Sequence, residues 1–432
     1  MEKNVFKNAS WIIGCKIVQS FISLIIGLIT ARYLGPSNFG IISYVSSVVA
    51  FAVPIMQLGL NQILVREFIK NPKDEGKILG TSLTINIISS LFCMVGSIGF
   101  VILTNPGEKE TIFVCALYSL TLLFQATEIT QYWFQSKLLS RYPSIATLIA
   151  YAIVAVYKIY LLITEKSIIW FALSHVFDYL IVSVILLFIY RKIGNQKLFV
   201  NWNLAKELFS KSKYYIIPSL MVMVFHHTDR IMLNLMIDEK ETGLYSAAIT
   251  CIGMTAFVFS AVIESARPVI LEAKEKDNAI YEKRIVQLYC IITYLSLAQS
   301  IGMTLFAKPI VFLLFGPEYA KTAEILSVAV WFITFSHYGS VRNIWILAEG
   351  KQKYLAKINI AGGIINVLLN LLAIPVMGAE GAALASVITQ FFTNTIMNYI
   401  VKPIRYNNSL MLQGLNPGIL IESVKSLKNN GA

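Results

Sequence analysis

The chain has 432 residues, of which 56% are hydrophobic and only 14% are charged, and its mean hydropathy is +0.66. Soluble domains carry about 25% charged residues, so this composition excludes an ordinary soluble protein and indicates a polytopic membrane protein. The formal net charge is +12. It does not indicate nucleic-acid binding, because the positive residues cluster between apolar stretches, as in the cytoplasmic loops of membrane proteins.

Apolar stretches of about 20 residues, the length that crosses about 30 Å of hydrocarbon, recur along the chain. They predict an all-α membrane protein with about twelve transmembrane helices. Gly and Pro mark many of the links, such as Gly35-Pro36 and Gly316-Pro317. In chain order, the predicted spans are residues 10–34, 39–64, 79–104, 111–134, 144–163, 168–190, 214–237, 243–270, 285–306, 324–347, 358–377 and 380–401.

The distribution of Lys and Arg predicts the orientation of the chain. With the N-terminus inside, 26 of the 36 Lys and Arg residues fall on inside segments and 6 on outside segments. We therefore expect a multi-pass protein with both termini in the cytoplasm.

The longest inside segment, between spans six and seven, divides the chain into halves. It contains NWNLAKELFSKSK, which favours a short amphipathic helix on the inner leaflet. Each half has an even number of spans, so an internal repeat has to be parallel. The predicted parts are a six-helix bundle at 1–190, a cytoplasmic linker at 191–213, a second six-helix bundle at 214–402, and a loosely ordered cytoplasmic tail at 403–432.

The span at 214–237 carries His226, His227, Asp229 and Arg230 near its middle. Ionisable groups at that depth are expensive and normally face a wet cavity or a partner. His226, Asp229 and Arg230 can share one helix face. The two histidines are either imidazoles bonded to their neighbours or members of a proton relay, because imidazole titrates near neutral pH.

Charged side chains interrupt other spans as well, and each lines a cavity, forms a local ion pair or reaches a membrane edge. Arg267 can be a positive-inside anchor, and Lys158 can pair with Asp178. The candidates for binding an anionic substrate are Lys16, Lys158, Arg230, Arg267 and Arg342, and the candidates for ion coupling or pairing are Glu128, His226, Asp229 and Glu264.

Signatures of catalysis are missing from the sequence. It has no GxxxxGK[ST] phosphate loop, no GxSxG elbow and no long outer loop. The five cysteines form no CxxC pair, and the four histidines form no HExxH, so no metal site is predicted. We expect a protein that is not an enzyme, that has no cofactor and that uses an ion gradient.

Four segments carry a family resemblance: ARYLGPSNFGIISYVSS, HHTDRIMLNLMIDEKETGLYSAA, GPEYAKTAEIL and IPVMGAEGAALASVIT. In this order and spacing they resemble the bacterial flippases of O-antigen and capsule repeat units. That family belongs to the multidrug/oligosaccharidyl-lipid/polysaccharide exporter superfamily. The resemblance covers all twelve spans.

The resemblance implies two six-helix bundles around a central cavity, in the bacterial inner membrane. It implies a substrate made of an oligosaccharide on undecaprenyl pyrophosphate, moved to the outer leaflet by alternating access coupled to an ion gradient. A polysaccharide polymerase is a further candidate partner. The family pattern places cations at Lys16, Arg230 and Arg267, with Asp229 and Glu264 as coupling or pairing candidates.

Four alternatives stay open on the sequence alone. One is a lipid-facing structural scaffold, which does not explain the charged residues within the span at 214–237. A multidrug/cation antiporter of the same superfamily predicts an acidic, aromatic pocket. A peptidoglycan-precursor flippase usually has two extra C-terminal spans. A membrane glycosyltransferase or polymerase, which belongs to a different class, needs catalytic carboxylates in a sizeable outer loop.

Overall fold

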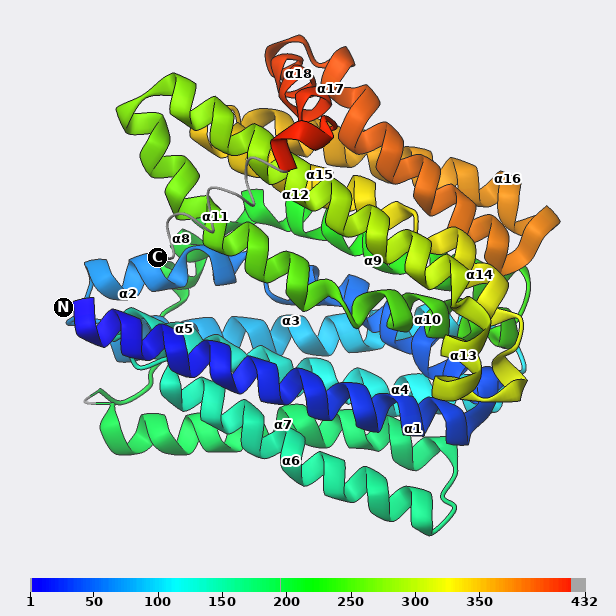
Figure 1. Ribbon diagram of the computed structural model, residues 1–432. Helices are drawn as coiled ribbons and strands as arrows, with labels where there is room; N and C mark the ends of the chain where they lie inside the picture. The colour runs from blue at the N-terminus through cyan, green and yellow to red at the C-terminus, as the bar shows by residue number, and fades with distance from the viewer. Residues whose placement is uncertain (1, 195, 421–432) are drawn as a thin grey trace. The chain divides into compact units, whose positions relative to one another are not determined.

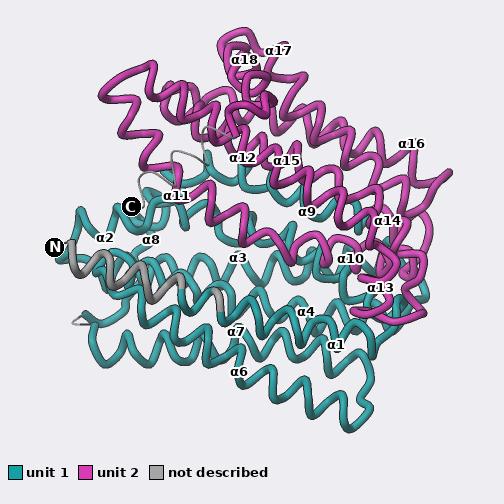
Figure 2. Tube along the Cα trace, viewed as in Figure 1, with its two compact units in different colours: residues 1–231 teal, residues 232–432 magenta. Residues whose placement is uncertain are grey.

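The structure, a computed structural model, describes residues 2–194 and 196–420, with side chains from residue 14 onward except that of residue 17. All secondary-structure elements in these ranges are helices. The chain divides into two compact units, Met1–Ile231 (unit 1) and Met232–Ala432 (unit 2) (Figure 2). Their boundary falls inside helix α9, so the predicted linker groups with unit 1.

Unit 1 begins with a helix that contains two predicted spans. Gly35, with φ 69° and ψ 171°, breaks α1 between them, and only glycine adopts such a φ without steric cost. The 3₁₀ turn Ala126–Ile129 interrupts the fourth span. The helices of unit 1 (Figure 1) are α1 (Glu2–Met56), α2 (Leu64–Lys70), α3 (Glu75–Thr104), α4 (Lys109–Gln125), α5 (Thr130–Ser136), α6 (Arg141–Ile163), α7 (Ile168–Ile193), α8 (Trp202–Ser212) and most of α9 (Ile216–Met236).

Unit 2 repeats this plan of long helices with breaks. Gly378, with φ 58° and ψ −133°, divides α16 into two spans, and α10 meets α11 at a bend of 44°. A π-helical turn, Phe392–Ile396, follows α16. The helices of unit 2 are α10 (Glu239–Gly253), α11 (Ala256–Lys276), α12 (Asn278–Leu305), α13 (Ala307–Phe315), α14 (Thr322–Ala329), α15 (Phe332–Ala348), α16 (Lys353–Phe391), α17 (Met397–Ile400) and α18 (Tyr406–Gln413).

The helices account for all twelve predicted spans. By length and hydropathy, seven helices in the described part of the chain can cross a membrane, or eight if α10 and α11 form one bent span. Two of them, Gly14–Met56 and Lys353–Ile400, have 43 and 48 residues, enough for two crossings of about 20 residues each. The predicted spans 214–237 and 324–347 coincide with α9 and with α14–α15, which do not meet the combined criteria of length and hydropathy.

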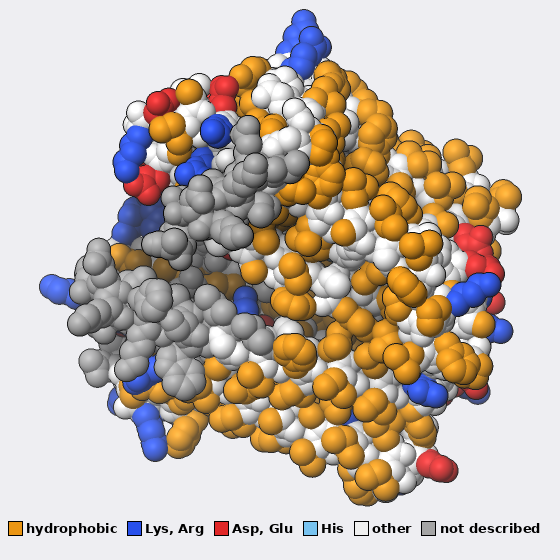
Figure 3. All heavy atoms as spheres, viewed as in Figure 1, with side chains coloured by type: hydrophobic (Ala, Val, Ile, Leu, Met, Phe, Trp, Pro, Cys, Tyr) orange, Lys and Arg blue, Asp and Glu red, His pale blue; other side chains and the backbone are white. Residues whose placement is uncertain are grey.

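The flanks of both units are apolar. On the face shown in Figure 3, hydrophobic side chains cover most of the helical surface, and charged side chains lie mainly toward the helix ends. Phe92, Leu103 and Val376 are 75%, 82% and 83% exposed, which suits contact with lipid and not with water. The predicted multi-pass, all-α membrane fold is confirmed.

The segment 196–213, here called the strap, belongs to unit 1 and packs there against α3 and the 3₁₀ turn Leu60–Gln62. The Gly76 N–H donates to Gln196 Oε1 at 2.8 Å, and the Ser212 hydroxyl donates to the Leu58 carbonyl at 2.7 Å. Helix α8 lies within this segment, where the sequence predicts an amphipathic helix.

The strap is also held by charge. Lys211 Nζ lies 3.0 Å from Glu67 Oε1 and 2.8 Å from Glu207 Oε1. Hydrogen bonds to Glu207 and Glu67 raise the pKa of Lys211, so this lysine stays charged at neutral pH.

Part of the predicted tail is ordered, which corrects the expectation of a loose segment. Tyr406–Gln413 forms α18, and Asn407 is fully buried, where its Oδ1 accepts a hydrogen bond from the Tyr289 hydroxyl at 2.8 Å. An amide bonded to a buried tyrosine fixes this segment against α12. Residues 421–432 of the predicted tail lie outside the described residues.

Candidate functional site

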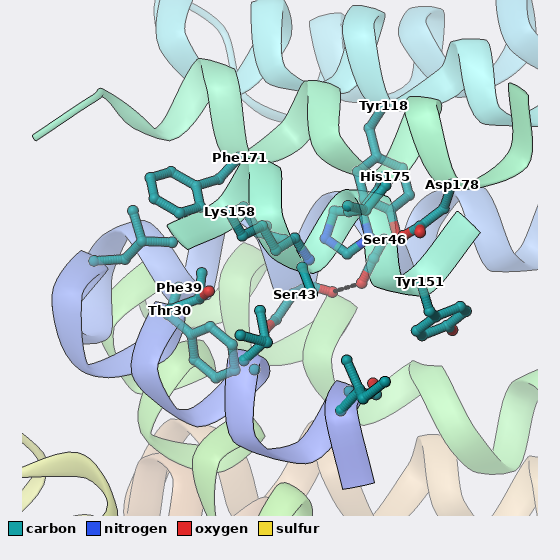
Figure 4. Close-up of a pocket in the computed structure, with 18 residues that line it drawn as sticks. Thr30, Phe39, Ser43, Ser46, Tyr118, Tyr151, Lys158, Phe171, His175 and Asp178 are labelled. Atoms are coloured by element: carbon teal, nitrogen blue, oxygen red, sulfur yellow. Dashed lines mark hydrogen bonds between the residues drawn. The ribbon is translucent and has the colours of Figure 1, made fainter. Parts of the chain in front are cut away.

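A cavity of about 250 Å³ lies inside unit 1, among α1, α4, α6 and α7 (Figure 4). Helix α1 packs against α6, α6 against α7, and α4 against α7, so the walls come from five of the predicted spans. The polar side chains that line the cavity are Ser23, Thr30, Ser43, Ser46, Lys158, His175 and Asp178, and the aromatic ones are Phe39, Tyr118, Tyr151 and Phe171.

Two opposite charges enter this cavity from neighbouring helices. Lys158 comes from α6 and Asp178 from α7 (Figure 4). They are close enough to interact electrostatically, but they form no ion pair within 4.0 Å among the described residues. Asp178 Oδ1 is buried without a hydrogen-bond partner. Lys158 and Asp178, the pair that the sequence allows, therefore share one cavity without forming an ion pair.

Hydroxyl groups and rings complete the wall. The Ser46 hydroxyl donates to the Ser43 carbonyl at 3.0 Å, and the His175 and Tyr118 rings lie 5.1 Å apart between centroids. Thr30 is 8% exposed, and its Oγ1 has no hydrogen-bond partner. The cavity thus offers one cation, one anion and several hydroxyls in an otherwise apolar bundle.

Helix α9 brings its predicted charged residues onto adjoining turns. Arg230 Nη1 donates to the His226 carbonyl at 3.2 Å. Asp229 is 5% exposed, whereas the His226 side chain is exposed. His227 Nδ1 lies 3.2 Å from the Ser47 hydroxyl, so α9 is hydrogen-bonded to α1. A histidine held in this way serves the packing of unit 1, and the roles of Asp229 and Arg230 toward a substrate or an ion stay predictions.

Two further candidates of unit 1 lie apart from the lining of the cavity. Glu128 lies in the 3₁₀ turn between α4 and α5, half-buried, and its carboxylate makes no hydrogen bond or ion pair in the described part of the chain. Lys16 lies on α1 with an exposed side chain. Neither residue lines the cavity.

The candidates in unit 2 are bonded to their neighbours. Arg267 Nη2 lies 3.0 Å from Glu264 Oε1 on the same helix, with both side chains substantially exposed. Arg342 is only 2% exposed, and it donates to the Thr393 carbonyl at 3.0 Å and to Asn343 Oδ1 at 3.1 Å. The Thr393 carbonyl belongs to the π-helical turn. Arg342 therefore holds this turn in place, and its predicted substrate contact stays untested.

Sequence reasoning did not select His175, Asp178 or the cavity tyrosines as site residues. A signal for two of them was present, because His175 and Asp178 are three residues apart and so share one face of a span. The sequence allowed a pairing of Asp178 with Lys158, but nothing in it showed that this face also meets the serines of α1. In the described residues, no group of three or more His, Cys, Asp or Glu side chains could hold a metal ion.

The amino-acid sequence matches a known protein family. Residues 5–274, more than half of the chain, match the family described as "Polysaccharide biosynthesis protein". The chain belongs to this family. The resemblance to polysaccharide repeat-unit flippases is thereby confirmed.

Individual relatives agree with the family. The chain is 22% identical to the capsular polysaccharide biosynthesis protein CapF of Staphylococcus aureus, over 92% of this chain and 99% of that protein. It is 28% identical to an uncharacterized membrane protein of Methanocaldococcus jannaschii, over 50% of this chain and 44% of that one. It is 24% identical to a putative O-antigen transporter of Salmonella typhi, over 42% and 44%. The last two matches span less than half of the relatives.

Solved structures share the fold. The lipid II flippase MurJ in an inward closed conformation aligns with a TM-score of 0.70 at 15% identity, over 96% of this chain and 92% of that one. An inward-facing multidrug resistance MATE transporter of the MOP superfamily aligns with a TM-score of 0.69 at 12% identity, over 91% and 95%. The predicted two-lobe fold of about twelve helices is confirmed.

Proposed function

We propose that the protein is a flippase that moves oligosaccharide units linked to undecaprenyl pyrophosphate from the inner to the outer leaflet of the bacterial plasma membrane. The observation that carries this proposal is a charged, hydroxyl-lined cavity inside a lipid-facing bundle of a polysaccharide biosynthesis protein. Relatives whose names read "probable low-salt glycan biosynthesis flippase", from Haloferax volcanii, and "putative O-antigen transporter", from Salmonella typhi, support it.

The physical obstacle is the head group of such a lipid. A pyrophosphate with attached sugars cannot enter hydrocarbon without losing its hydration, at a cost of many kcal/mol. Side chains along the path replace that hydration, while the polyprenyl tail stays in lipid. Arg230 and Lys16 are candidates for the pyrophosphate, and the planar fork of arginine matches phosphate oxygens better than the point charge of lysine.

The protein is a transporter in this proposal, and an ion gradient supplies the free energy. The sequence has no phosphate loop for a nucleotide. Glu128, Asp229 and His226 are the candidate groups for a coupling ion. Movement by alternating access, both termini in the cytoplasm and delivery of the units to a polysaccharide polymerase complete the proposal.

A multidrug/cation antiporter fits the cavity less well. Such a protein needs an acidic pocket, whereas this cavity holds one lysine and one aspartate among its lining residues. A glycosyltransferase or polymerase needs catalytic carboxylates in a sizeable outer loop, and the sequence has no long outer loop. The family match supports polysaccharide biosynthesis and not drug export.

The test is translocation by the purified, full-length protein. It is reconstituted into liposomes with the fluorescently labelled lipid-linked oligosaccharide taken from the cells that make it, and a membrane-impermeant quencher reports which leaflet holds the label. We expect label to change leaflet in an ion-gradient-dependent manner, and empty liposomes to show none. Equal rates in both preparations would refute the proposal.

A further inference from the structure

We infer that the cavity inside unit 1 binds a single uncharged sugar ring of the transported unit, and that the pyrophosphate binds elsewhere. This inference rests on the proposed function. It assigns to Lys158 the recognition of a sugar hydroxyl, in place of the contact with an anion that the sequence predicts.

The balance of charge in the cavity favours an uncharged ligand. Lys158 and Asp178 line the same space and carry opposite charges, and no other Asp, Glu, Lys or Arg among the described side chains lines it. A pyrophosphate bound at Lys158 would stand beside the Asp178 carboxylate, and like charges in a poorly hydrated site repel strongly. A neutral ligand meets no such penalty.

The spacing of the two charges favours hydroxyl groups. Lys158 has three N–H donors and no acceptor, while the Asp178 carboxylate only accepts. Because the two groups are too far apart for an ion pair, a group that both accepts and donates can bridge them. Asp178 Oδ1 and the nine-tenths-buried Thr30 Oγ1 both lack partners. A sugar ring carries several hydroxyls that both accept and donate, and it can satisfy these three side chains together.

The size and the walls of the cavity fit one ring. Pockets for drug-sized ligands have about 300–1,000 Å³, so a cavity of about 250 Å³ takes a single sugar and not a chain. Phe39, Tyr118, Tyr151 and Phe171 line it. Aromatic faces carry partial negative charge, which attracts the polarised C–H groups on the apolar face of a pyranose.

The experiment compares two lipids that differ only in the sugars. Full-length protein in nanodiscs is titrated with undecaprenyl pyrophosphate and with the lipid-linked oligosaccharide extracted from the source cells. For the wild type we expect tighter binding of the glycosylated lipid. Binding of undecaprenyl pyrophosphate without any gain from the sugars would overturn the inference alone, and binding of neither lipid would overturn the proposed function as well.

Two variants with a matched control locate the effect in the cavity. Ala155→Leu fills the cavity from α6 without removing a polar group, and Ala152→Leu adds the same side chain at an exposed position of that helix. Lys158→Met removes the proposed hydroxyl donor. We expect Lys158→Met to weaken binding of the glycosylated lipid about tenfold or more, as for the loss of one hydrogen bond to a charged group. We expect Ala155→Leu to weaken it as well, because the leucine side chain occupies the space of the sugar ring. The Ala152→Leu control should bind as the wild type does.

The second lipid gives the decisive comparison. We expect Lys158→Met and Ala155→Leu to bind undecaprenyl pyrophosphate with unchanged affinity, which also shows that both variants fold. If Lys158→Met weakens binding of both lipids by the same factor, Lys158 binds the pyrophosphate and the inference is wrong. If neither variant changes binding of the glycosylated lipid, the cavity holds no part of the substrate.

Discussion

Replacing Gly80 with alanine should weaken the docking of the strap on α3. A Cβ at Gly80 would lie 2.6 Å from the Phe199 carbonyl oxygen and 2.8 Å from the Phe199 nitrogen. Both are backbone atoms, so no side-chain rotation relieves the contact. The neighbouring hydrogen bond from the Asn201 N–H to Thr81 Oγ1, at 3.0 Å, has to lengthen when the strap moves away.

The magnitude follows from these contacts. Overpacking of this kind costs about 1–3 kcal/mol, and the disturbed hydrogen bond adds about 1 kcal/mol. Alanine returns about 0.5–1 kcal/mol because it is a better helix former than glycine. The docked state of the strap should therefore lose about 1–3.5 kcal/mol, which increases the population of the undocked state about fivefold to several hundredfold.

Limited trypsin digestion of the purified protein measures this population through cleavage after Lys197, at the beginning of the strap. Gly96→Ala is the matched control, since Gly96 lies on the same helix and a Cβ there meets nothing within 4 Å. We expect Gly80→Ala to be cleaved at least several times faster than Gly96→Ala, with similar global melting temperatures. Equal cleavage rates in the two variants would refute the claim that close backbone contact holds the strap.

Three further predictions concern buried polar groups and the charged turns of α9. Trp133→Phe removes the donor to Glu75 Oε2 at 2.8 Å and should lower the free energy of unfolding by about 1–3 kcal/mol, measured by thermal melting in detergent. Arg342→Met leaves carbonyl oxygens unpaired in the core and should lower it by a similar amount; an unchanged melting temperature would contradict a packing role. Asp229→Asn and Arg230→Ala should each abolish surface polysaccharide in a complementation assay at normal protein abundance, and wild-type polymer in both would count against α9 as part of the path.

Much of the fold could be predicted because glycine and hydropathy leave clear signals. Gly35 and Gly378 stand between apolar stretches, and each breaks a long helix at a left-handed φ. The end of the second span was predicted less well. It was placed at residue 64, but α1 ends at Met56, because Gly59 turns the chain at φ 71° under the strap. That turn depends on a contact with Ser212, far away in sequence, which no local pattern reveals.

The candidate site could be predicted only as a set of charges, because hydropathy shows that a charge is inside a span but not what it meets there. Among the five predicted cations, Arg342 and Arg267 are bonded within unit 2. Lys158 shares a cavity with Asp178. Arg342 meets the carbonyl of Thr393 on a distant turn, and Lys158 and Asp178 lie on different helices. Only the pair Glu264 and Arg267, three residues apart on one helix, follows from sequence spacing.

The positions of these charges bear on which side chains bind the sugars of the substrate and which bind its pyrophosphate. A lysine balanced by a carboxylate inside one bundle does not attract a dianion, whereas a sugar has no net charge and needs donors and acceptors. Recognition of the sugars can then depend on this cavity and differ between relatives, while the pyrophosphate is common to every transported unit and binds outside the cavity. The prediction that separates these roles is that Lys158→Met should change the preference among sugars, whereas Arg230→Ala should weaken binding of every pyrophosphate lipid alike. If the Lys158→Met variant binds neither lipid, one charged site binds both the sugars and the pyrophosphate of the substrate.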